Sequence, residues 1–128
     1  MTTLKTMTRV RLGAMVEALA VDGVASMGWR ILNRNWRCRY GELDVIACDA
    51  DRRTVVFVEV KTRTGDGYGG LAHAVTERKV RRLRRLAGLW LADQEERWAA
   101  VRIDVIGVRV GPKNSGRTPE LTHLQGIG

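Results

Sequence analysis

The stretch VVFVEVKTRTG, residues 55–65, ends an apolar run with an acid and an amine placed two residues apart, Glu59 and Lys61. Side chains two residues apart on a strand point to the same face, so this carboxylate and this ammonium project together. A second acid, Asp44, lies in the preceding apolar run, GELDVIAC. A hairpin between the two runs would bring Asp44 beside Glu59. Two carboxylates in one small volume repel each other unless a proton or a cation intervenes.

Magnesium, or manganese in its place, is the cation that such a pair of carboxylates favours. Mg²⁺ prefers hard oxygen ligands, takes one or two protein carboxylates and keeps several waters. One of those waters can attack phosphorus, while Lys61 orients it or stabilises the charge that develops on the phosphoryl oxygens. The simpler alternative is a strand end that reaches solvent, where Asp44, Glu59 and Lys61 are ordinary surface charges. Spacing alone leaves both interpretations open.

One small domain must supply the elements that position these residues. The chain has 128 residues with 45% hydrophobic content, which is enough for one ordinary core and too little for two. Helical spacing predicts a first helix over residues 8–25, which frays or stops near Gly23, and a second over 77–92, capped by Thr76. Extended patterns predict four strands, at residues 29–33, 42–48, 54–61 and 101–110.

These elements predict an α/β fold, with a mixed sheet flanked by helices in the order α-β-β-β-α-β. We expect the domain to span residues 1–110. The tail over residues 111–128 is expected to be mostly loop, with room for one short edge strand near Leu121. Asp104, in the last predicted strand, either adds a third carboxylate to the site or, as we favour, pairs with Arg102 in a structural role.

The charge of the chain makes nucleic acid the leading partner. The formal net charge is +8, and the second predicted helix carries six cations against the single acid Glu77. Arginine forks bind phosphate oxygens bidentately and without sequence choice. The strongest candidates for contacts to DNA are Arg63, Lys79, Arg82 and Arg85. A solvated helix face, or a helix that meets an acidic protein, are the alternatives.

A membrane partner is not expected. No apolar run approaches the roughly 20 residues that a spanning helix needs. The polar start of the chain also resembles no signal peptide. We therefore expect a cytoplasmic protein.

The spacing of Asp44 and Glu59-Val60-Lys61 resembles the D-(x)n-E-x-K motif of the PD-(D/E)xK phosphodiesterases, the restriction-endonuclease-like superfamily. A longer frame is more specific. The stretches RILNRNWRCRYGELDVIACD, TVVFVEVKTRTG and AVTERKVRRLRRLA resemble the YraN family of small bacterial endonuclease-like proteins over roughly residues 9–108. That family is similar in fold to archaeal Holliday-junction resolvases, which implies a three-layer fold.

The resemblance also implies roles for individual residues. Asp44 and Glu59 match the metal-binding carboxylates, Lys61 the catalytic lysine, and Glu17 the glutamate that the first helix contributes, while the carbonyl of Val60 would be a further metal ligand. A metal-dependent endonuclease acting on DNA, branched DNA included, is the implied function. A homodimer would suit an enzyme that acts on two strands symmetrically.

The first helix departs from the family pattern. Val16 stands where the family usually has a glycine, and Gly23 where it has an aromatic residue. Both changes alter the packing of the helix that carries Glu17. They motivate an alternative function, a DNA-binding module of the same fold that lacks useful turnover.

Overall fold

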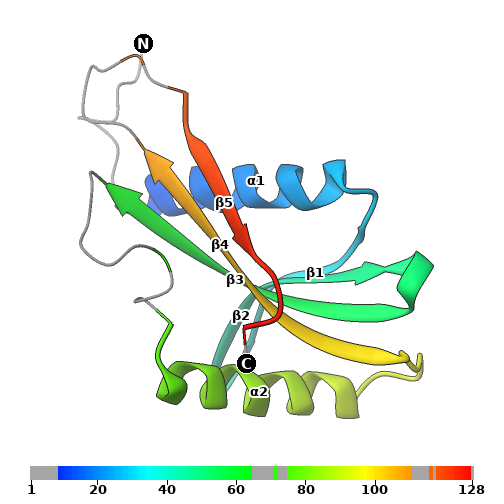
Figure 1. Cartoon of the computed structure of the whole chain (residues 1–128). Coiled ribbons are helices and arrows are strands. Elements are labelled where there is room, and N and C mark those ends of the chain that lie inside the picture. The colour runs from blue at the N-terminus through cyan, green and yellow to red at the C-terminus, as the bar shows by residue number, and fades with distance from the viewer. Residues whose placement is uncertain (1–8, 65–70, 72–74, 111–115, 117, 128) are drawn as a thin grey trace.

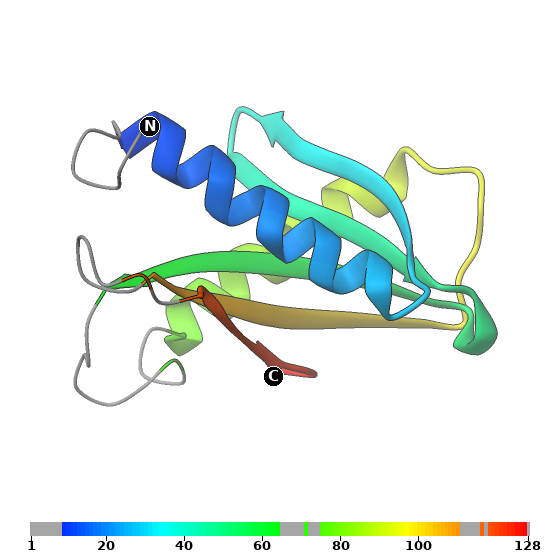
Figure 2. The same ribbon diagram turned by 90° about the horizontal axis from the view of Figure 1, so that it is seen from above.

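Three layers make up the protein. The computed structural model describes residues 9–64, 71, 75–110, 116 and 118–127. Helix α1 (Arg9–Ser26) covers one face of a five-stranded sheet and helix α2 (Glu77–Ala92) covers the other, as Figures 1 and 2 show from two directions. The strands are β1 (Arg30–Cys38), β2 (Gly41–Asp49), β3 (Thr54–Thr64), β4 (Ala100–Val110) and β5 (Glu120–Leu124). The predicted mixed α/β fold is confirmed, with β5 as an additional edge strand.

The strands lie in the sheet in their order along the chain. The β1–β2, β2–β3 and β4–β5 pairs are antiparallel, and a short 3-10 turn, η2 (Ala50–Arg52), links β2 to β3. The β3–β4 pair is parallel and needs a crossover, which α2 supplies. Parallel pairing continues from Thr54 to Thr64, so β3 is longer than its alternating pattern predicted. The β2–β3 ladder, in contrast, stops at Val45 and Val58.

Each face of the sheet carries its own hydrophobic cluster, and alternation along β3 separates them. Val56 and Val58 pack with α1, while Val55 and Phe57 pack with α2. Trp90 of α2 is buried among the second cluster. The same alternation holds at the polar end of β3, so every second side chain there is directed toward α2.

Besides β3, the first strand and the first helix extend beyond their predicted ends. β1 runs to Cys38 rather than to residue 33, because a register shift between Ile31 and Asn33 and a positive φ of 52° at Asn35 hide its regular alternation. α1 continues through Gly23 to Ser26. A Cβ at Gly23 would lie 2.9 Å from Leu121 Cδ2, so the glycine leaves room for a side chain from β5.

Membrane spanning by a helix is not supported, since none within the described ranges combines the length and the apolar character that crossing requires.

Candidate metal and nucleic-acid site

The candidate site begins where β2 separates from β3. Beyond Val45 the backbone ladder is replaced by a side chain, because Asp44 Oδ2 accepts a hydrogen bond of 2.8 Å from the backbone N–H of Val60. Val60 lies between Glu59 and Lys61, so Asp44 is tied directly to the E-x-K segment. The predicted approach of Asp44 to this segment is confirmed, although the contact runs through a side chain and not through a strand pair.

Glu59 and Lys61 lie on the α2 side of β3, where a second lysine joins them. Lys79 Nζ of α2 is 3.2 Å from Glu59 Oε1, and Lys61 Nζ is 3.9 Å from the same oxygen. The Glu59 side chain is only 12% exposed and that of Lys79 only 16%. Sequence reasoning selected Lys79 as a contact to DNA and did not foresee its pairing with Glu59, since the two residues lie on different elements.

Glu17 reaches the site from α1. Its Oε2 accepts hydrogen bonds from Arg34 Nη2 at 3.2 Å and from Asn35 Nδ2 at 3.0 Å. Its Oε1 is buried and has no hydrogen-bond partner among the described residues. Glu17 and Asp44 line one hollow of about 430 Å³, together with Glu42 and Val60. The structure thus brings Glu17 to Asp44, with Val16 buried in the core beneath the helix.

Three acidic side chains, those of Glu17, Glu42 and Asp44, line this hollow, and Arg37 pairs with Glu42 at 2.9 Å. Burial raises the pKa of Asp44 to about 6, against the lowering effect of the Val60 hydrogen bond, and the charges of Glu59, Glu42 and Glu17 raise it further. Glu42 was not among the predicted site residues. Its position two residues before Asp44 on the same strand was the signal that could have identified it.

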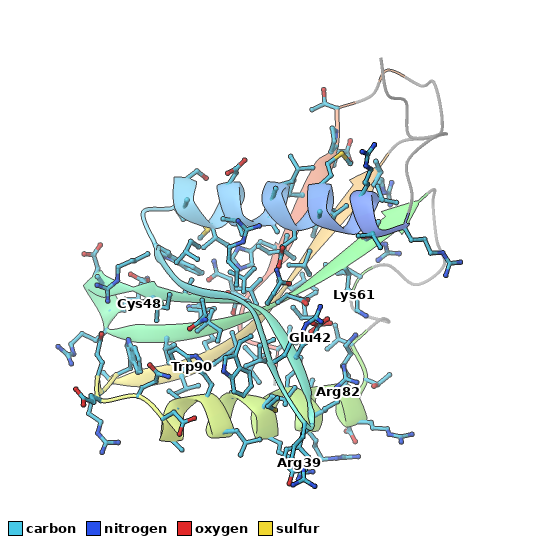
Figure 3. All side chains as sticks on the ribbon, turned by 180° about the vertical axis from the view of Figure 1, so that it is seen from behind. Arg39, Glu42, Cys48, Lys61, Arg82 and Trp90 are labelled. Carbon is cyan, nitrogen blue, oxygen red and sulfur yellow. The ribbon has the colours of Figure 1, made fainter. Side chains whose placement is uncertain are left out.

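Positive charge is crowded on the other side of β3. The pKa of Lys61 is lowered, first by hydrogen bonding with the Lys79 side chain and then by burial, while Glu59 and Asp44 act in the opposite direction. Lys61 is therefore held among carboxylates and beside a second amine. Figure 3 labels Lys61 on β3 and Glu42 on β2, the two strands whose ladder ends at this point.

A divalent cation fits the oxygen donors of this site. Within the described ranges, no three His, Cys, Asp or Glu side chains are gathered closely enough to enclose a metal ion. Mg²⁺ requires less than that, because one or two carboxylates with waters or phosphate oxygens complete its coordination. Asp44 and Glu59 would supply the carboxylates, and a cation there would favour the ionised form of Asp44 against burial, the main cause of its raised pKa, and against the smaller effect of the neighbouring acids. Glu59 would first have to release Lys79.

We expect Asp44→Asn to stabilise the fold at pH 8. The folded pKa of Asp44, about 6, lies above its ordinary value of 3.8, so ionisation opposes folding as pH rises between these values. The full cost at pH 8 is at most about 3 kcal/mol. The asparagine carbonyl can still accept the Val60 N–H, so the variant should gain about 1–3 kcal/mol at pH 8 and little at pH 4. Urea unfolding at both pH values measures this difference.

Asp51→Asn, which removes an exposed acid in η2, is the matched control. Its effect on the free energy of unfolding should be small at both pH values. A loss of stability in Asp44→Asn that is equal at pH 8 and pH 4 would contradict the interpretation of Asp44 as a destabilised carboxylate.

A basic surface adjoins the Glu59–Lys79 pair. It borders a hollow of about 560 Å³ lined by Thr76, Arg78, Lys79, Arg81, Arg82 and Arg85. Thr76 caps α2 as predicted, accepting the Lys79 N–H at 3.2 Å. Arg63 follows Lys61 by two residues and so faces the same side of β3. The predicted basic residues therefore lie next to the E-x-K segment rather than on a separate face.

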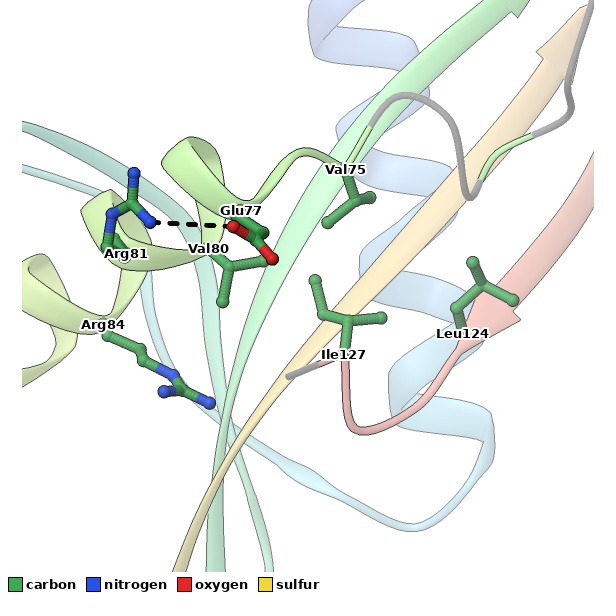
Figure 4. A pocket seen from close by; sticks show the side chains of 7 residues that line it. All are labelled: Val75, Glu77, Val80, Arg81, Arg84, Leu124 and Ile127. Atoms are coloured by element: carbon green, nitrogen blue, oxygen red, sulfur yellow. Dashed lines mark ion pairs between the residues drawn. The ribbon is translucent and has the colours of Figure 1, made fainter.

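Two other features lie outside this site. Asp104 is fully buried and paired with Arg102 Nε at 2.8 Å, which confirms the structural role favoured for it. A hollow of about 460 Å³ separates the start of α2 from the C-terminal segment (Figure 4). Its lining is mainly apolar, includes Leu124 and Ile127, and contains none of the carboxylates described above.

The sequence of this chain matches a known protein family and its individual members. The model of the uncharacterised protein family UPF0102 matches residues 16–108. A UPF0102 protein of Mycobacterium tuberculosis is 94% identical over 128 residues, which is 100% of both chains. The UPF0102 protein of Mycobacterium avium is 77% identical over 128 residues, covering 100% of this chain and 98% of the relative. That of Mycobacterium ulcerans is 70% identical over 125 residues, 98% of this chain and 100% of the relative. The chain therefore belongs to the UPF0102 family.

Proposed function

We propose that this protein is a metal-dependent endonuclease that hydrolyses phosphodiester bonds in DNA, with the PD-(D/E)xK site of restriction-endonuclease-like and resolvase-like enzymes. The observation that carries the proposal is the hydrogen bond from the Val60 N–H to Asp44, which joins the isolated carboxylate to the E-x-K segment. Surface charges that merely mark strand ends have no need of such a bond, nor of a half-buried carboxylate whose pKa is raised to about 6.

Each residue has a part in the proposed reaction. A bound Mg²⁺ or Mn²⁺ would supply Lewis acidity and an activated water. Asp44 and Glu59 hold the metal, and Glu17 accepts hydrogen bonds from water or a metal-bound group through its unpartnered Oε1. Lys61 donates to the attacking water or to the phosphoryl oxygens as charge develops on them. Water adds to phosphorus while the bond from phosphorus to one sugar oxygen breaks.

The basic surface supports DNA as the substrate. Arg82 and Arg85 are exposed on α2, beyond Lys79, and the chain carries a net charge of +8. Contacts of this kind neutralise phosphates irrespective of sequence and release counterions. Binding to DNA should therefore weaken steeply as salt is raised. If the basic helix served only to bind an acidic protein, no such salt-dependent binding to DNA would be expected.

A DNA-binding module without turnover is the second candidate. One observation favours it: Lys79 pairs with Glu59 in the structure, and no enclosing set of three metal ligands is formed within the described residues. The two candidates share the fold and the basic surface. They differ only in whether Glu59 exchanges Lys79 for a metal ion.

Cleavage of labelled four-way junction, flap and linear duplex DNA, with Mg²⁺, Mn²⁺ or EDTA, tests the proposed function. We expect products only in the presence of metal. We also expect binding in EDTA that falls with rising salt. Binding without any metal-dependent product would favour the module, and no binding to any of the three DNAs at low salt would contradict both candidates.

A further inference from the structure

The connection between β1 and β2 is held against α2 beside the basic surface. Cys38 pairs directly with Gly41, so Arg39 and Tyr40 form a two-residue tip. Gly41 has a φ of 144°, and a Cβ there would lie 3.3 Å from Leu86 Cδ1. Glycine therefore permits both the backbone conformation and the close approach of the tip to α2.

An aromatic side chain stands exposed at this tip. Tyr40 is 45% exposed and belongs to neither hydrophobic cluster. Two guanidinium groups lie against its ring, with Arg85 Cζ at 4.2 Å and Arg39 Cζ at 5.1 Å from the ring centroid. Exposed aromatic rings next to arginines are the elements with which proteins bind single-stranded nucleic acid.

Two separate elements give the same distance from the tip to the carboxylates. Along α2, Lys79 at Glu59 and Arg85 at Tyr40 are six residues apart, which is about 9 Å. Along β2, Gly41 and Asp44 are three residues apart, which is about 10 Å. One strand of stacked, helical DNA carries a phosphate for every ~3.4 Å of axial length, so an unpaired strand that keeps this stacking passes roughly three nucleotides over this distance.

Basic residues fill the interval. The hollow of about 560 Å³ is bordered by Lys79, Arg82 and Arg85, which recur every three residues and so follow one side of α2. Figure 3 shows Lys61, Arg82 and Arg39 succeeding one another from the end of β3 toward the tip. A strand with its phosphate at Asp44 and Glu59 can therefore extend along these arginines to Tyr40.

We propose that Tyr40, with Arg39 and Arg85, forms a stacking site for an unpaired base roughly three nucleotides from the phosphate that is cleaved. The inference rests on the proposed function and specifies its substrate class, DNA in which a single-stranded segment adjoins the cleavage position, as in a flap or an overhang. A base inside a duplex is already stacked and paired, so only an unpaired base can offer its face. Arginine planes also stack on bases, so the Tyr40–Arg85 pair presents a planar surface whichever of the two meets the base.

Binding in EDTA to a duplex with a five-nucleotide overhang, and to a blunt duplex of equal length, tests this site with the full chain. Tyr40→Ala should weaken binding to the overhang about five- to one-hundred-fold and leave blunt-duplex binding within about twofold. Tyr40→Phe, which keeps the ring, should bind like the parent. Arg82→Gln is the control for a phosphate contact and should weaken binding to both DNAs. An abasic nucleotide at the third unpaired position should weaken binding of the parent as much as Tyr40→Ala does. The same abasic DNA should weaken binding of Tyr40→Ala little further.

The outcomes separate this inference from the proposed function. Equal losses on both DNAs in Tyr40→Ala, or no loss on either, would overturn the stacking site. An overhang preference that depends on Tyr40 would support it even if no metal-dependent cleavage were found, in which case only the nuclease activity fails. A parent protein that binds neither DNA at low salt would overturn both.

Discussion

Replacing Asp104 with alanine is expected to lower the free energy of unfolding by about 3–5 kcal/mol, because the change leaves buried partners uncompensated. Asp104 is fully buried. Its carboxylate accepts two bonds from Arg102, at 2.8 and 3.0 Å, and one of 3.0 Å from the backbone N–H of Gly126. His123 Nε2 lies 2.7 Å from Oδ2. Urea unfolding of the parent and of the variant at pH 7 measures the loss.

The position of this network explains why its loss should be large. Arg102 lies on β4 and His123 on β5, and both contact Trp29 at the start of β1, His123 edge-to-face at 5.6 Å and Arg102 at 5.1 Å. One carboxylate thus joins β4, β5 and the C-terminal segment at Gly126. Hydrogen exchange should show β5 losing protection before the rest of the sheet. A change below about 1 kcal/mol would contradict this role.

The same carboxylate makes stability depend on acid. Burial raises the pKa of Asp104, but hydrogen bonds from His123, Arg102 and Gly126 outweigh it, so the net pKa lies below the ordinary value of 3.8. A lowered pKa means that Asp104 stabilises the fold above pH 3.8 and that this contribution is lost as pH falls through the folded pKa. The parent should therefore lose more stability than Asp104→Asn does when pH falls below about 4.

The sequence predicted the central residues of the site because their signals are local. Alternation along β3 placed Glu59 and Lys61 on one face, and the short turn after β2 brought Asp44 near them. The mixed sheet followed from the same patterns. Thr76 was identified as the cap of α2 because a threonine immediately before a helical pattern is itself a local signal.

What escaped prediction depends on contacts between distant segments. Lys79 finds Glu59 only because the β3–β4 crossover lays α2 along the sheet. Leu121 of β5 packs at Gly23 of α1, a contact that compensates for a glycine that weakens a helix in isolation. Asn35 donates a hydrogen bond to Glu17 from a left-handed backbone conformation, which the neighbouring sequence does not predict. In each case tertiary packing overrides the local preference.

Lys61→Met and Glu59→Gln are expected to reduce metal-dependent cleavage of bound DNA by about 100-fold or more each, for different reasons. Lys61 contributes an ammonium at the E-x-K segment, 3.9 Å from Glu59 Oε1, and methionine keeps the length of the side chain without the charge. Under the proposed function Glu59→Gln would remove a charged metal ligand, so it should also weaken Mn²⁺ binding in calorimetry, whereas Lys61→Met should not. Single-turnover cleavage, with the protein in excess over the DNA and at a saturating concentration, isolates the reaction from binding.

Arg63→Met is the matched control, since Arg63 lies two residues beyond Lys61 on the same strand and the same face. It should weaken DNA binding, and its single-turnover cleavage rate at saturating protein should stay within a few-fold of the parent rate. Lys61→Arg tests the charge of Lys61 separately from the shape of its amine. The guanidinium keeps the charge that Lys61→Met lacks, but it is too large to take the place of a compact amine beside Lys79. If Lys61→Met cleaved at the parent rate, Lys61 would be one of two lysines that merely balance Glu59, and the role of charge donor to the phosphate would pass to Lys79, 3.2 Å from the same carboxylate.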